Sequence, residues 1–169
     1  PLRDPRGSTA RRAPYGGAQV ALAASPSRSN SLASAREFWT TRQAEFFPYA
    51  IDPPAYRQQA APVLRAYLEG FGDVDGKVVL DLGCGNGELA VYAARLGATV
   101  WAVDFSASGV RNTGTLAEHN GVGDRVQAVE LDAMAVADLG PEFDLVIGKN
   151  VLHHLEPFQE FVGTLHDIL

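Results

Sequence analysis

The chain has 169 residues, of which 46% are hydrophobic and 20% charged, with a formal net charge of −6, the profile of a soluble globular protein with one core. Its longest apolar runs are four to six residues, far short of the roughly 18 that a transmembrane helix needs, so we predict no membrane partner. Cys84 is the only cysteine, which excludes an internal disulfide.

Residues 1–36 form a basic segment that differs from the rest of the chain. It holds six arginines and one acid, so the remainder carries 8 basic and 19 acidic residues, a net charge of −11. The segment is rich in Ser, Ala, Arg and Gly with little to bury, which predicts disorder. It is typical of a flexible tail on a cytoplasmic protein, or of a transit peptide to an organelle such as a mitochondrion or plastid. The acidic remainder argues against nucleic acid as a partner.

Residues 37–76 are predicted to form an N-terminal helical region. Pro53 and Pro54 interrupt the chain, and Pro62 suits the first turn of a helix that runs to Glu69. Five aromatic residues gather within a dozen positions near the start of the region, which predicts that this stretch packs on a partner surface: Phe38, Trp39, Phe46, Phe47 and Tyr49.

The most informative stretch is residues 78–87, where a predicted strand runs into a glycine loop. Residues 78–82 are apolar except for Asp81, which suits a strand buried on both faces. Glycines at every second position then allow a tight turn and a close approach of the backbone to a ligand. Residues 88–96 favour a helix that Gly97 ends. The loop therefore lies between a strand and a helix, where nucleotide cofactors meet backbone N–H groups.

The spacing of these glycines distinguishes between nucleotide cofactors. The dinucleotide fingerprint is G-x-G-x-x-G, whereas this loop is G-x-G-x-G with Glu88 at the place of the third glycine. Asp81 would also repel a pyrophosphate and suit a cationic ligand. Residues 81–87 resemble the first motif, acid-x-Gly-x-Gly-x-Gly, of the class I S-adenosylmethionine-dependent methyltransferases. We therefore expect S-adenosyl-L-methionine as the cofactor.

A second acid follows the next predicted strand. Residues 98–103 favour a strand that leads to Asp104, 17 residues beyond Gly87, near the roughly 20-residue spacing at which a carboxylate reaches ribose hydroxyls. By resemblance, Phe105 packs on the adenine. Ser106 can cap the helix that follows.

Two more predicted strands complete the pattern. The strand at 126–131 leads to Asp132, which by resemblance accepts a hydrogen bond from the adenine amino group. Residues 143–148 favour a fourth strand, and the segment 149–155, Lys-Asn-Val-Leu-His-His-Leu, looks like the segment that follows the fourth strand in the family. A last helix is predicted over residues 158–169.

The resemblance implies an α/β fold with a Rossmann-like doubly wound sheet over residues 77–169. That fold carries seven strands in the order 3-2-1-4-5-7-6, and this sequence supplies the first four, so strand four would be an exposed edge. Either the chain is a fragment, or a homodimer or partner chain pairs with this edge. In the family a short aromatic N-terminal helix covers the cofactor cleft. For residues 37–76 we expect such a lid, or simple packing against the sheet edge.

His153 and His154 are the catalytic candidates, because they follow the fourth strand at the carboxyl end of the sheet. Methyl transfer mainly requires alignment, which can lower a barrier by roughly 7–11 kcal/mol, and it needs a base only if the nucleophile carries a proton. The alternative is that both imidazoles bond to the backbone at a helix start. Without Cys or carboxylate at ligand spacing, the pair predicts no metal. Cys84 has no basic neighbour in sequence and is interpreted as small loop filler rather than a nucleophile.

The predicted function is methyl transfer to a small-molecule acceptor. The Asn-Pro-Pro-aromatic motif of base-amino methyltransferases is absent, which argues against adenine methylation in DNA or RNA. The alternatives are a non-catalytic cofactor-binding or scaffold subunit that pairs through the open edge and, against the loop spacing, an NAD-dependent oxidoreductase. The expected cofactor-binding residues are Asp81, Gly83, Cys84, Gly85, Asn86, Gly87, Asp104, Phe105, Asp132, Ala133, Met134, Lys149 and Asn150.

Overall fold

The computed structural model describes residues 28–169, so most of the predicted basic tail lies outside the described residues. Helix α1 (Arg28–Arg42) begins ahead of Glu37, where the sequence predicts that ordered structure starts. Helices α2 (Pro53–Gln59) and α3 (Pro62–Glu69) follow, each with proline in its first turn. Residues 28–76 thus contain three helices, and α1 begins within the segment 1–36.

Four parallel strands form one sheet in the order β3-β2-β1-β4. Their bounds are β1 Val78–Leu82, β2 Thr99–Asp104, β3 Val126–Glu130 and β4 Leu145–Gly148. The connections carry α4 (Glu88–Arg95), α5 (Ala107–His119) and the 3-10 helix η2 (Ala133–Leu139), and helix α6 (Phe158–Ile168) comes last. Both the α/β class and the relative order of the four predicted strands are confirmed.

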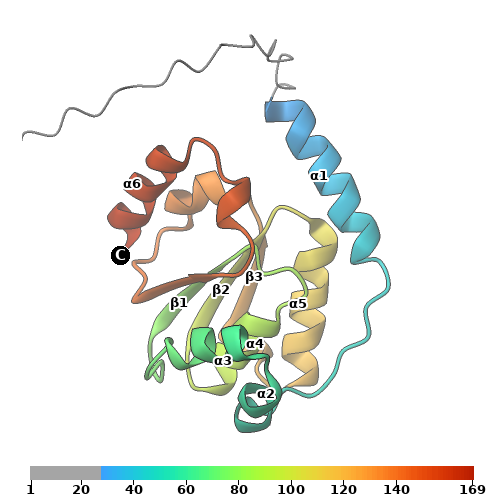
Figure 1. Ribbon diagram of the computed structural model, residues 1–169, viewed down its shortest axis with the longest axis vertical. Helices are drawn as coiled ribbons and strands as arrows, with labels where there is room; N and C mark the ends of the chain where they lie inside the picture. The colour runs from blue at the N-terminus through green and yellow to red at the C-terminus, as the bar shows by residue number, and fades with distance from the viewer. Residues whose placement is uncertain (1–27) are drawn as a thin grey trace, which may run out of the picture.

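The sheet is covered on both faces, which explains its nearly continuous apolar strands. Val79 and Val100 face a core built with α3, α4 and α5. Leu80 and Leu82, on the opposite face of the same strand, pack with Val136 of η2 and residues of α6. Figure 1 shows this arrangement, with α6 and α5 on different sides of the sheet.

The segment between α1 and α2 runs beside α5 (Figure 1). The side chain of Asn120 accepts a hydrogen bond from the Ile51 amide (2.6 Å) and donates to the Tyr49 carbonyl (2.9 Å). Of the five clustered aromatic residues, only Phe46 packs against the core, whereas Phe47 is 84% exposed. The predicted packing of this cluster is therefore confirmed for one member only.

Strands β3 and β4 are the two edges of the sheet within residues 28–169. The end of β4 is tied to helix α3, because the Tyr67 hydroxyl accepts from the Gly148 amide (2.9 Å) and lies 3.0 Å from the Gly148 carbonyl oxygen. None of the helices within the described range has both the length and the apolar character that crossing a bilayer requires.

Candidate functional site

A cleft of about 1230 Å³ opens at the carboxyl ends of the strands. Its walls come from the glycine loop, the ends of β2 and β3, the segment after β4, and helix α1. Of the predicted site residues, Gly87 and Met134 do not line it. Those that do are Asp81, Gly83, Cys84, Gly85, Asn86, Asp104, Phe105, Asp132, Ala133, Lys149, Asn150, His153 and His154.

The three loop glycines serve different purposes. A Cβ on Gly83 would lie 2.8 Å from Cγ2 of Val151, and one on Gly87 would lie 2.8 Å from the Thr113 backbone. The nearest atom to a Cβ on Gly85 is Nε2 of Gln43, at 3.8 Å. Two of the glycines are therefore required by the protein's own packing, and Gly85 is the one that leaves room for a ligand in the cleft.

Asp81 is a buried carboxyl group with one unsatisfied oxygen. It is 1% exposed, the backbone of Ala90 hydrogen-bonds to it, and its Oδ2 has no partner among the described residues. Burial raises the pKa of Asp81 to about 8, and the charge of Asp104 acts in the same direction. An unpaired buried carboxylate is costly, so this position favours either a neutral acid or a bound cation.

Asp104 ties the glycine loop to the start of α5. Its Oδ2 accepts from the Gly85 amide and its Oδ1 from the Ser106 amide, both at 2.9 Å. Burial raises the pKa of Asp104, while these two backbone bonds lower it. Since a carboxylate has about four acceptor positions, Asp104 retains capacity for ligand hydroxyls. The side chain of Ser106 accepts from the Gly109 amide, so the predicted helix cap is confirmed.

Two glycines of α5 are expected to respond in opposite directions to alanine. A Cβ on Gly109 would lie 2.9 Å from the Gly85 carbonyl oxygen and 3.2 Å from Asp104 Cγ, whereas Gly114 has nothing within 4 Å. Gly114→Ala should therefore stabilise the protein by up to about 1 kcal/mol. Gly109→Ala should destabilise it by about 1–2 kcal/mol, because overpacking outweighs the gain in helix propensity. Urea unfolding of both variants measures the difference, and equal stabilisation would contradict the close approach.

Further lining residues come from α1 and from the segment after β4. Helix α1 contributes Trp39 and Arg42, which the predicted site residues did not include. The short 3-10 helix η3 (Leu152–His154) contributes His153 and His154, with ring centroids 3.9 Å apart. Burial, followed by the neighbouring His153, lowers the pKa of His154. In the part of the chain that the structure describes, neither imidazole bonds to the backbone.

Cys84 lies in a buried environment within the glycine loop. Cys84 is buried with its Sγ 3.4 Å from Thr113 Oγ1, and burial raises the pKa of its thiol well above the usual value. A thiol in that state is a poor nucleophile, as expected for loop filler. Within residues 28–169, no group of three or more His, Cys, Asp and Glu side chains is placed to hold a metal ion.

Comparison with known proteins identifies the family. The sequence profile of a family described as "Methyltransferase domain" matches residues 79–169, which contain the glycine loop, Asp104 and all four strand ends. The chain belongs to this family. The methyltransferase match thus spans the sheet and most of the cleft, while helix α1 lies outside it.

Two curated relatives share one name. This methyltransferase domain is similar to a protein named "Ubiquinone biosynthesis O-methyltransferase" from Caulobacter sp. (strain K31), with 31% identity over 141 residues, 81% of this chain and 55% of the relative. A protein of the same name from Rhizobium leguminosarum bv. trifolii (strain WSM2304) is 36% identical over 115 residues, 61% of this chain and 45% of the relative. The chain spans about half the length of these relatives.

A solved structure shares the fold. Magnesium protoporphyrin IX methyltransferase (ChlM) from Synechocystis PCC 6803, crystallised with bound SAH, superposes with a TM-score of 0.58 and 25% identity. The match covers 80% of this chain and 67% of that one. The similarity extends beyond the family profile into the N-terminal helical region.

Proposed function

We propose that this chain forms the cofactor-binding part of an S-adenosylmethionine-dependent methyltransferase that methylates a hydroxyl group of a small molecule. The observation that carries the proposal is the unsatisfied Oδ2 of Asp81 in the cleft beside the glycine loop. S-adenosylmethionine is a cation at its sulfonium and ammonium groups, so it offers the charge that a buried carboxylate lacks. The relatives named O-methyltransferases support oxygen as the acceptor atom.

The residues that line the cleft suit the parts of this cofactor. Asp81 would face a positive group, the open side of Gly85 would admit the cofactor against the backbone, and Asp104 would accept from the ribose. Phe105 and Asp132 lie in the same wall, where they would contact the adenine. When bound, the cofactor supplies an activated methyl group, so the protein has to align the acceptor and exclude water.

The two histidines that line the cleft would serve a hydroxyl acceptor. Because its pKa is lowered, His154 stays neutral at pH 7 and can accept the proton that the hydroxyl releases. His153 lies against it and would orient the ring. Trp39, which also lines the cleft, offers an aromatic surface for a small planar acceptor.

Titration of the 169-residue chain with S-adenosylhomocysteine and with NAD is the experiment that tests this proposal. The homocysteine analogue keeps the adenosine and the ammonium group, so we expect it to bind. We expect NAD not to bind, because the loop has Glu88 where the dinucleotide fingerprint has its third glycine. Circular dichroism confirms folding in the same samples. Preferential binding of NAD would favour the oxidoreductase alternative, and a folded chain that binds neither would favour a scaffold.

A further inference from the structure

Helix α1 is attached to the rest of the molecule by polar contacts. From residue 33 to residue 42 no side chain of the helix is buried, and Phe38 is 52% exposed. Arg36 forms an ion pair with Glu130 at the end of β3 (3.1 Å), and Thr40 Oγ1 lies 3.4 Å from Ser106 Oγ. Without an apolar face, such a helix docks weakly, since exposed ion pairs contribute roughly 0–1 kcal/mol.

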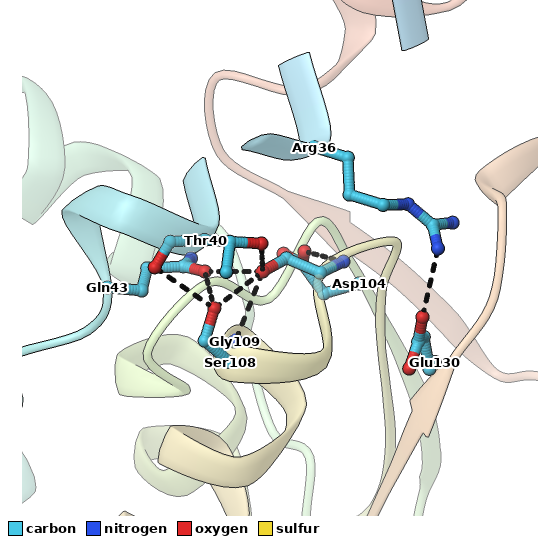
Figure 2. A network of polar contacts seen from close by, with 8 residues as sticks. Arg36, Thr40, Gln43, Asp104, Ser108, Gly109 and Glu130 are labelled. Carbon is cyan, nitrogen blue, oxygen red and sulfur yellow. Dashed lines mark hydrogen bonds and ion pairs between the residues drawn. The ribbon is translucent and has the colours of Figure 1, made fainter. Parts of the chain in front are cut away.

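Gln43, directly after this helix, differs from residues 33–42 because its side chain is buried. It is 7% exposed, and its Oε1 accepts hydrogen bonds from the hydroxyls of Ser106 (2.9 Å) and Ser108 (3.4 Å). Asn112 of α5 donates to its backbone carbonyl at 2.8 Å. Both serines are themselves buried, at 0% and 2% exposure. Figure 2 shows Gln43 pointing from the end of α1 into the start of α5.

The network continues from Gln43 to the acid that faces the cleft. Ser106 donates a hydrogen bond to Gln43 from its hydroxyl and one to Oδ1 of Asp104 from its amide. The Gln43 side chain also lies near Gly109, where an added Cβ would be 3.2 Å from both Gln43 Nε2 and Asp104 Cγ. Three elements therefore meet with little free space, and Ser106 links the residue that follows α1 to Asp104.

We propose that Gln43 is a positioning residue for Asp104, and that it couples the docking of α1 to occupancy of the cofactor cleft. This inference rests on the proposed function, because it takes the ligand of Asp104 to be the cofactor ribose. Coupling between two sites is reciprocal. A ligand held by Asp104 then also tightens α1, and α1 contributes Trp39 and Arg42 to the lining of the cleft. The acceptor side is thereby completed only when the cofactor is present.

A purely structural role for Gln43 predicts a different behaviour. In that case the amide would only satisfy the two serine hydroxyls and fix the start of α5. Its loss would lower the free energy of unfolding, because a buried acceptor of two hydrogen bonds is removed, although the Ser106 and Ser108 hydroxyls still lie 2.8 Å from each other. Ligand affinity and the response of α1 to ligand would stay the same.

The test compares Gln43→Met with Glu45→Gln in the 169-residue chain. Methionine keeps most of the side-chain volume but cannot accept the hydrogen bonds that the two serine hydroxyls donate to Gln43. Glu45 is an exposed residue outside the network. We expect the dissociation constant for S-adenosylhomocysteine to rise about 5- to 10-fold in Gln43→Met and to stay unchanged in Glu45→Gln. Hydrogen exchange of the α1 amides should slow on saturation with this ligand in the unmodified chain and in Glu45→Gln, but not in Gln43→Met.

Equal affinity in all three proteins, with the same protection of α1, would overturn the coupling while leaving the proposed function standing. Failure of the unmodified chain to bind S-adenosylhomocysteine would overturn both. If Gln43→Met does not fold, Ser108→Ala removes one donor to Gln43 and leaves the Ser106–Asp104 bond in place. A rise of about 2- to 3-fold in the dissociation constant with weaker protection of α1 would support the proposal, and no change in either would refute it.

Discussion

Asp81→Asn is expected to remove most of the affinity for S-adenosylhomocysteine while leaving the fold intact. Asparagine has nearly the same shape as the acid and can still accept from the backbone of Ala90. It has no negative charge to pair with the ligand ammonium. Truncating one partner of a buried charge pair costs about 2–5 kcal/mol, or roughly 30- to 5000-fold in affinity. Titration calorimetry of both proteins at pH 8 measures the loss.

The same substitution should change how stability depends on pH. The pKa of Asp81 is about 8 in the folded protein against 3.8 as its ordinary value. Between these limits the unfolded chain has lost the proton and the folded chain keeps it, so the folded state binds more protons. The free energy of unfolding therefore falls as pH rises, by about 1.4 kcal/mol per pH unit from this group. Asp81→Asn lacks this contribution and should gain stability relative to the unmodified chain as pH increases.

Urea unfolding at pH 5, 6, 7 and 8 tests this directly. The difference in free energy between the two proteins isolates Asp81, because the remaining titrating groups are common to both. Asp138→Asn, at an exposed acid outside the cleft, is the matched control and should alter neither binding nor the pH slope. Parallel stability curves for Asp81→Asn and the unmodified chain would mean that Asp81 is ionised and paired in the folded protein.

The sequence predicts the elements and the gathering of the site well, for a physical reason. The short apolar runs that lead to Leu82 and Asp104, with glycines close by, favour strands buried on both faces, and the carboxyl ends of parallel strands meet at one edge of the sheet. The predicted acids therefore come together without any knowledge of side-chain contacts. The left-handed turn in the loop and the Ser106 cap follow from local chemistry in the same way.

The contribution of α1 could not be predicted in this way. Helix α1 has no apolar face, so no periodic pattern in the sequence indicates which of its side chains turn toward the cleft. Gln43 is one amide among many polar residues, and only the fold shows that it is buried against two serines. Gly109 and Gly114 likewise look equivalent in the sequence. Their difference comes from which side of α5 meets the glycine loop.

Gly87→Ala is expected to cause a large loss of stability. Gly87 has a φ of 86°, where a non-glycine residue is strained by about 1–3 kcal/mol. Its added Cβ would also lie 2.8 Å from Thr113, a residue with no exposed surface, and overpacking costs about 1–3 kcal/mol more. The sum is a large share of the roughly 5–15 kcal/mol that holds a typical domain together.

Gly85→Ala is the matched comparison, because it shares the strain without the contact. Its φ is 58° and the nearest atom to its Cβ lies 3.8 Å away, so we expect a loss of only about 1–2 kcal/mol. The added methyl group would instead occupy space that the cofactor needs, and affinity for S-adenosylhomocysteine should fall. Urea unfolding and calorimetry of the two variants separate these effects. Equal stabilities would mean that α5 does not press on the loop at Thr113, and full affinity in Gly85→Ala would mean that the ligand does not approach the backbone there.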